Sequence, residues 1–95
     1  MIERHITFNV HPGRGGEFER FFADAYRPAM SLSAGFVSVG LLCEMDHPSR
    51  YQMVLRFEDA EAATGWRTSQ PHQALQPDLN ALHAGMEIVA YDVLA

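Results

Sequence analysis

The side chains able to carry positive charge or move protons are limited in type, because this chain of 95 residues contains no lysine. Its cations are seven arginines and five histidines. A guanidinium stays protonated near neutral pH and cannot act as a general base. The absence of lysine also excludes a Schiff-base lysine and a Walker lysine. Proton transfer is left to the histidines, the carboxylates and the single cysteine, Cys43.

His72 is the histidine whose spacing points towards the protein interior. It shares one face of an expected helix with Leu75, Leu79 and Leu82. A reference pKa of about 6.5 suits a proton carrier. A lone inward histidine is more often a packed residue bonded to a backbone carbonyl, so both interpretations stay open. No histidine pair has a metal-binding spacing such as H-x-H, and we expect no metal site.

Two further residues could bind a ligand. Trp66 is the only tryptophan, and it is either a packing residue or a platform for a flat ligand. Arg56 is the one charge inside the third expected strand. Its guanidinium either pairs with an acid such as Glu3 or Glu87, or holds a ligand carboxylate or phenolate.

Charge and hydropathy exclude several other classes of function. The net charge of −5 argues against a nucleic-acid partner. No apolar run reaches the length of a membrane span, and the first residues do not resemble a signal peptide. Cys43 stands alone, which excludes an intramolecular disulfide. We therefore expect a cytoplasmic protein with no membrane partner.

Alternating and helical hydrophobic patterns predict elements in the order β-α-β-β-α-β. A turn is expected at residues 46–49, and Pro28 is expected to kink or end the first helix. The strands are expected at 2–10, 36–45, 51–57 and 86–94; the first helix has an apolar stripe of Phe18, Phe21, Phe22, Ala25 and Ala29; the second begins after Asp59 and restarts after Ser69.

This order predicts a single α+β domain over residues 1–95, a ferredoxin-like sandwich with an antiparallel sheet in the order 4-1-3-2. Both helical segments would cover the same face. The strands at 36–45 and 51–57 nevertheless carry apolar residues on both faces. An apolar face of the sheet without helices is expected to be buried against another surface, and the simplest such surface is that of a second copy of the chain. We therefore predict a homodimer that packs sheet against sheet.

Several short motifs together resemble the antibiotic biosynthesis monooxygenase family. Residues 8–14 followed by Glu17-Phe18 resemble its opening strand, Pro-Gly turn and Glu-Phe helix. Residues 34–38 resemble the entry to its second strand. The best match is the acid-rich turn at 58–62 with the W-R-x-S-x-x-H segment at 66–72. The resemblance covers essentially the whole chain, and the stress-responsive dimeric α/β barrel family is similar as well.

The resemblance implies a dimeric α/β barrel with a pocket between helices and sheet. Members of the family oxidise polycyclic aromatic phenols without metal or flavin, or degrade haem. The matching motif positions imply that Trp66 stacks on the substrate rings and that His72 takes a proton. We add Arg56 as a catalytic group that stabilises the phenolate, and Tyr51 and Asn9 as candidates for hydrogen bonding to the substrate.

Three functions stay open at this point. The first is a cofactor-independent monooxygenase acting on a small aromatic phenol or quinol. The second is a non-catalytic dimeric protein that binds a small hydrophobic ligand or serves a stress response, and the third is an isomerisation or cyclisation. We expect no cofactor. Haem is the alternative, although Gln76 stands near the place where the haem-degrading branch carries its histidine.

Overall fold

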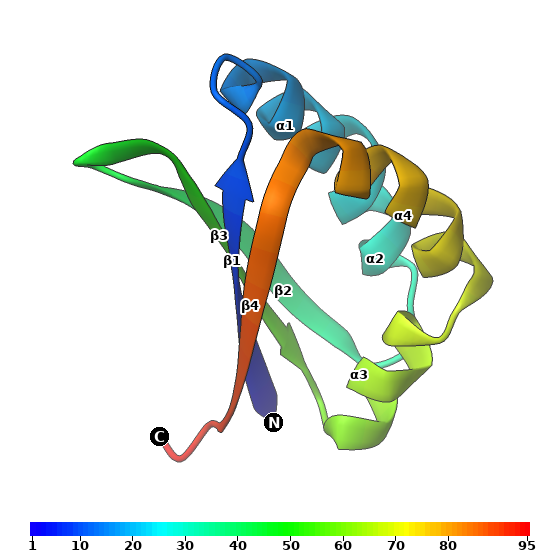
Figure 1. Ribbon diagram of the computed structural model, residues 1–95. Helices are drawn as coiled ribbons and strands as arrows, with labels where there is room; N and C mark the ends of the chain where they lie inside the picture. Colours follow the sequence, from blue (N-terminus) through cyan, green and yellow to red (C-terminus); the bar gives the residue numbers. More distant parts are fainter.

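The computed structural model describes residues 1–95 and contains one four-stranded antiparallel sheet with every helix on the same face (Figure 1). The strand order β2-β3-β1-β4 is the predicted order, so the ferredoxin-like fold is confirmed. The strands are β1 (Ile2–Val10), β2 (Phe36–Glu44), β3 (His47–Phe57) and β4 (His83–Asp92), and the helices are α1 (Gly15–Phe21), η1 (Phe22–Tyr26), α2 (Arg27–Ser31), α3 (Ala60–Arg67) and α4 (Gln70–Leu82).

The register of the strands decides which side chains face the helices. On the central strand β1, Ile6 lies between Met53 of β3 and Ile88 of β4. Ile6 is buried against the helices, and His5, one residue earlier, faces the opposite way because successive side chains alternate. The helix-facing side therefore forms the core, and the other side has no helix over it.

The hairpin between β2 and β3 is tighter than predicted. The turn occupies residues 45–46 rather than 46–49, and β3 begins at His47. The ladder between β1 and β3 ends at Arg50, so Pro48 lies where β3 has β2 as its only neighbour and the register is irregular. A proline is tolerated at such a position because no central ladder bond is lost.

The last strand also begins earlier than predicted, at His83 rather than residue 86. Val10 at the end of β1 pairs with His83, and the amide N–H of His11 donates to the carbonyl of Leu82. These contacts draw the chain into the sheet directly after α4, which leaves no loop between them.

The first helical segment continues through Pro28, although the sequence predicted a kink or an end there. Five residues, Phe22–Tyr26, form the π-helix η1, in which the N–H of Arg27 donates to the carbonyl of Phe22. Pro28 has no N–H for an α-helical bond, and the π turn lies directly before it. The fully buried residues of this segment are Phe18, Phe22, Tyr26 and Met30. Phe18 and Phe22 belong to the predicted stripe, and its members Phe21 and Ala29 are partly buried against the core.

The two predicted N-caps of the second helical segment are confirmed. The Asp59 carboxylate accepts a 2.8 Å bond from the N–H of Ala62 and begins α3. The Ser69 hydroxyl accepts from the N–H of His72 and begins α4. The segment therefore divides into two helices at a defined break.

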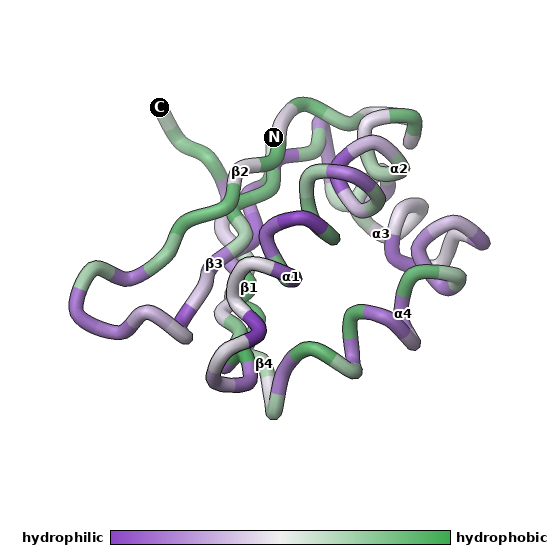
Figure 2. The backbone as a smooth tube through the Cα atoms, turned by 90° about the horizontal axis from the view of Figure 1, so that it is seen from above, coloured by the Kyte–Doolittle hydropathy of each residue, from purple (hydrophilic) through white to green (hydrophobic).

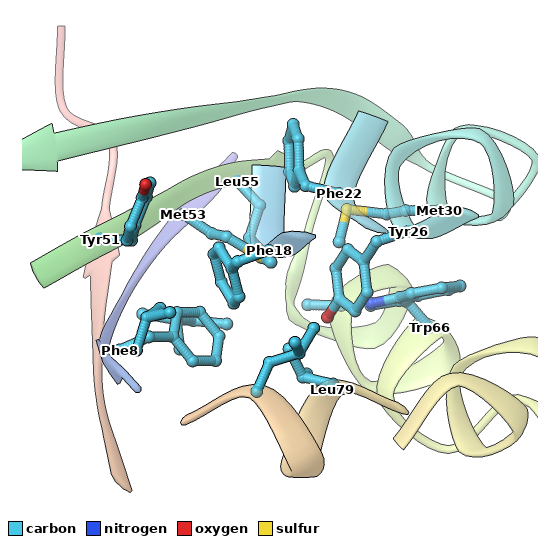
Figure 3. Close-up of a cluster of buried hydrophobic side chains, with 14 of the residues drawn as sticks. Phe8, Phe18, Phe22, Tyr26, Met30, Tyr51, Met53, Leu55, Trp66 and Leu79 are labelled. Carbon is cyan, nitrogen blue, oxygen red and sulfur yellow. The ribbon is translucent and has the colours of Figure 1, made fainter. Parts of the chain in front are cut away.

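The core lies between the helices and the sheet, where aromatic rings and aliphatic side chains converge (Figure 3). It contains no buried polar or charged residue. Its members are Ile6, Phe8, Val10, Phe18, Phe22, Tyr26, Met30, Tyr51, Met53, Leu55, Phe57, Ala63, Trp66, Leu79 and Leu82. None of the helices has both the length and the apolar character required to cross a membrane.

The face of the sheet without helices is partly apolar. Seen from above, the helices gather on one side of the strands, and the β2–β3 hairpin projects away from them (Figure 2). Leu42, Val89 and Tyr91 are each about half exposed, and alternation places all three on the uncovered face.

Gly35, the residue directly before β2, lets α3 lie close to the start of that strand. Its φ is +77°, and a Cβ added there would overlap the Cβ of Ala62. We expect Gly35→Ala to lower the free energy of unfolding by about 1–3 kcal/mol, because a side chain is strained at positive φ. In Gly65→Ala, nothing lies near the added methyl group, and the free energy should rise by about 0.5–1 kcal/mol. Urea unfolding measures both, and equal effects of the two variants would contradict this account.

Candidate active site

A cavity of about 110 Å³ lies between the helices and the sheet, where the family resemblance implies a pocket. It is largely apolar, since eight of its twelve lining residues are hydrophobic. The lining residues are Arg4, Ile6, Phe8, Tyr26, Leu55, Trp66, Arg67, His72, Gln76, Leu79, Met86 and Ile88.

Trp66 and His72 lie together at this cavity. Their ring centroids are 5.1 Å apart with an interplanar angle of 83°, an edge-to-face contact. Tyr26, from the π-helix, makes a second edge-to-face contact with Trp66 at 5.7 Å. Figure 3 shows the Tyr26 hydroxyl beside the indole nitrogen of Trp66. Burial raises the pKa of Tyr26, and its hydrogen bond with Trp66 opposes this rise.

Ser69 holds Trp66 and His72 in this relation. Its hydroxyl donates to the Trp66 carbonyl at 2.7 Å and accepts from the His72 N–H at 3.3 Å. One side chain therefore provides hydrogen-bond partners for a carbonyl in the last turn of α3 and for an N–H in the first turn of α4. The W-R-x-S-x-x-H spacing follows from these two bonds, because Ser69 lies three residues after Trp66 and three residues before His72.

The imidazole of His72 is kept neutral near pH 7. Burial lowers its pKa and the positive charge of Arg67 lowers it further, while a hydrogen bond with the backbone of Arg67 opposes these two effects. Its Nε2 lies 3.3 Å from the Gln76 amide nitrogen, while its buried Nδ1 has no hydrogen-bond partner in the protein. His72 lines the cavity, and a neutral imidazole can accept a proton.

Arg4 and Arg67 are site residues that the sequence analysis did not select. Arg4 lies on the helix-facing side of β1, half buried, and no carboxylate pairs with it. Burial lowers its pKa, and so does the nearby charge of Arg67. The sequence feature that could have identified Arg4 is its position, because it interrupts the apolar face of the first strand. Arg67 is the second residue of the W-R-x-S-x-x-H segment.

Arg56 is not at this cavity. It lies on the uncovered face of the sheet, and its Nε donates a 2.6 Å bond to Glu3. Glu3 also contacts His5 Nε2 at 2.5 Å. The bond with His5, followed by that with Arg56, lowers the pKa of Glu3. Of the two interpretations left open for Arg56, the structure shows the ion pair with Glu3.

Tyr51 and Asn9 also lie away from Trp66 and His72. Tyr51 faces the helices, but its hydroxyl donates to Glu19 Oε2 at 2.7 Å and its ring packs on Phe18. Burial raises the pKa of Tyr51, and the Glu19 carboxylate raises it further. Asn9 is exposed on the other face, near the β2–β3 hairpin. The structure thus brings together two of the five predicted site residues.

No group of three or more histidine, cysteine, aspartate or glutamate side chains is arranged to hold a metal ion. The polar groups at the cavity are instead two guanidiniums, one imidazole, one amide, one phenol and one indole N–H. This set can bind an anion, donate hydrogen bonds and move a proton.

Comparison with known families gives a match over most of the chain. Residues 1–78 match the sequence model of the family described as antibiotic biosynthesis monooxygenase. None of the curated proteins compared matches this chain.

Solved structures share the fold over nearly its full length. A proposed antibiotic biosynthesis monooxygenase from Bordetella bronchiseptica has a TM-score of 0.89 at 24% identity and covers 99% of this chain and 97% of its own. SnoaB from Streptomyces nogalater, a cofactor-independent oxygenase, has a TM-score of 0.87 at 25% identity, covering 97% and 91%. A conserved protein from Methanosarcina mazei has a TM-score of 0.85 at 19% identity, covering 95% and 89%.

The electrostatics of the cavity can be tested by NMR titration of the histidine rings. We expect the pKa of His72 to lie below 6.5 because burial and Arg67 both disfavour the imidazolium. Arg67→Gln should raise that pKa, since one of the two causes is removed. Arg20→Gln, which removes the same charge from an exposed site outside the cavity, should leave it unchanged. Equal shifts in the two variants would contradict a local effect of Arg67.

Proposed function

Because the chain belongs to the antibiotic biosynthesis monooxygenase family, we propose that it is a cofactor-independent monooxygenase acting on a small aromatic phenol or quinol. The observation that carries the proposal is the contact between Trp66 and a neutral His72 at one apolar cavity. The fold is shared with SnoaB, which is a cofactor-independent oxygenase.

The proposed reaction needs no electrons from the protein. Loss of the hydroxyl proton makes the ring electron-rich, and a ring carbon of the phenolate then bonds to dioxygen to give a peroxide. Loss of water from that peroxide leaves a carbonyl at the carbon. For a phenol the balance is one phenol and one O₂ to one quinone and one water, with all four electrons supplied by the substrate.

His72 takes the proton in this scheme. In the tautomer that accepts at Nδ1, Nε2 carries the other proton. A half-turn of the Gln76 amide from its 3.3 Å contact presents the amide oxygen as acceptor for that proton. Gln76 thereby holds the ring in one orientation while Nδ1 changes its protonation state. The lowered pKa of His72 keeps the accepting form populated at neutral pH.

The remaining groups bind and shield the substrate. Trp66 and Tyr26 provide an aromatic wall, and Leu79 closes the apolar side. Arg4, rather than Arg56, is the guanidinium on the sheet that lines the cavity, and it can hold an anionic group of the substrate. The apolar lining excludes bulk water from the reactive anion.

The size of the cavity limits the substrate. A cavity of about 150 Å³ accommodates benzene, so a cavity of about 110 Å³ suits one ring after a small expansion. Met86 and Ile88 lie at its edge and are about half exposed, so movement of these side chains can enlarge it. Haem does not fit, because pockets for larger ligands occupy about 300–1,000 Å³. No step is therefore assigned to haem.

A second candidate is a non-catalytic protein that binds a small hydrophobic ligand. The observation in its favour is that Trp66 is only 3% exposed and packs as a core residue. This candidate predicts ligand binding without oxygen consumption.

We also propose that two copies associate through the uncovered face of the sheet. Leu42, Val89 and Tyr91 offer apolar surface there, and the ring of Tyr91 packs on His5 at 4.7 Å. A second copy would bury these side chains and would complete a dimeric α/β barrel.

Oxygen consumption with a panel of monocyclic phenols and quinols tests the enzyme. We expect His72→Gln to lower kcat/KM by about 100-fold or more, because glutamine cannot take the proton. Its activity should partly recover at a pH where the phenol ionises unaided. In the wild type, activity should fall on the acid side only below about pH 6.5, since protonation of His72 removes the base.

Trp66→Phe should mainly raise KM, because a smaller ring keeps the packing but offers less stacking surface. His47→Gln is the matched control for His72→Gln, since His47 is exposed and outside the cavity. Wild-type rates in both His72→Gln and Trp66→Phe would refute the assigned roles. Binding without oxygen uptake by any panel member would favour the non-catalytic candidate.

Light scattering after size exclusion tests the dimer. We expect the wild type at twice the mass of one chain at micromolar concentration, and Val89→Asp at the mass of one chain, because a charge would be buried in the interface. Leu32→Asp is the matched control, since Leu32 is 88% exposed and follows α2 on the other side of the molecule. A wild-type protein at the mass of one chain would contradict the proposed dimer.

A further inference from the structure

We infer that the cavity selects an aromatic substrate that carries a carboxylate in addition to its phenol, and that Arg4 and Arg67 bind that carboxylate. This inference rests on the proposed function for the identity of the reacting group. The binding of the carboxylate itself stands on the arrangement of charges around the cavity.

The two arginines at the cavity lack the acid partners that three arginines of the chain have. Arg14 pairs with Glu17 at 2.9 Å, and Arg56 pairs with Glu3 at 2.6 Å. Neither Arg4 nor Arg67 forms an ion pair, and neither guanidinium donates a side-chain hydrogen bond within the protein. Their donors are therefore free for a ligand.

The position of Arg4 makes an unpaired guanidinium costly. Its side chain is half buried on the core side of β1, and it lies within the electrostatic range of Arg67. Partial burial and a neighbouring like charge both disfavour a cation. A bound anion would relieve both effects, because it supplies the missing hydrogen bonds and offsets the repulsion.

The cavity is charged at one end and apolar at the other. Arg4 and Phe8 lie on the same side of β1, four residues apart, which separates them by about 13 Å along the strand. Arg4, Arg67 and His72 all line the cavity, and the charge of Arg67 lowers the pKa of the other two groups. Phe8 pairs with Met86 at the other end.

This division favours a ligand with an anionic group at one end and a ring towards the other. A guanidinium matches a planar carboxylate through two parallel N–H bonds. The volume of about 110 Å³ limits the ligand to a single ring, which enters after the small expansion at Met86 and Ile88. A hydroxybenzoate has both features, with its carboxylate at the two arginines and its ring against the apolar lining of the cavity.

The test compares 4-hydroxybenzoate with 4-hydroxybenzamide, which has nearly the same shape but no charge. Isothermal titration calorimetry should give the wild type at least a tenfold lower Kd for the carboxylate. In Arg4→Gln this preference should fall to less than threefold, because the affinity for the carboxylate falls. Arg67→Gln should lose part of the preference. Arg20→Gln changes the net charge equally and should retain all of it.

Chemical-shift changes of the His72 ring on titration would show that the ligand binds in the cavity. Equal Kd values for acid and amide in the wild type, or an equal loss of preference in Arg20→Gln and Arg4→Gln, would overturn the inference. Those results leave the proposed function intact if neutral phenols are still oxidised. A tenfold preference that depends on Arg4, with no oxygen uptake for any phenol, would instead support the carboxylate site and refute the oxygenase.

Discussion

The site depends on the two hydrogen bonds of one hydroxyl. Ser69 Oγ donates to the carbonyl of Trp66 and accepts from the N–H of His72, and so joins the end of α3 to the start of α4. Both backbone groups belong to helix ends that have no intrahelical partner. The bond to His72 is the N-cap of α4, and the bond to Trp66 fixes its orientation relative to α3. The aromatic pair therefore keeps its 5.1 Å contact without depending on a loop.

The walls of the cavity are also part of the core, and this overlap constrains function. Trp66, Tyr26 and Leu79 are almost fully buried, so their positions are set by the packing that stabilises the fold. The adaptable parts are elsewhere: Met86 and Ile88 at the edge of β4, and the two arginines at the charged end. Substrate choice can therefore change through these residues while the aromatic wall stays intact.

Much of this arrangement could be predicted from the sequence because it depends on local rules. Strand order follows from the sequence of elements, and the caps at Asp59 and Ser69 follow from side-chain chemistry. The inward direction of His72 follows from helical periodicity. Arg56 shows what local rules miss. Strand alternation places Arg56 and Leu55 on opposite faces of the sheet. Only the packing of the helices reveals which of these faces contains a cavity.

The π-helix is a second feature that the hydrophobic pattern of the sequence did not predict. A residue repeated every four positions in an α-helix drifts by about 40° per step, or about 120° from Phe18 to Met30. The sequence stripe was therefore expected to follow the 3.6-residue period. The wider turn of η1 offsets part of this drift, so Phe18, Phe22, Tyr26 and Met30 all stay buried. This smaller rotation per residue in η1 turns Tyr26 towards Trp66 and completes the aromatic wall.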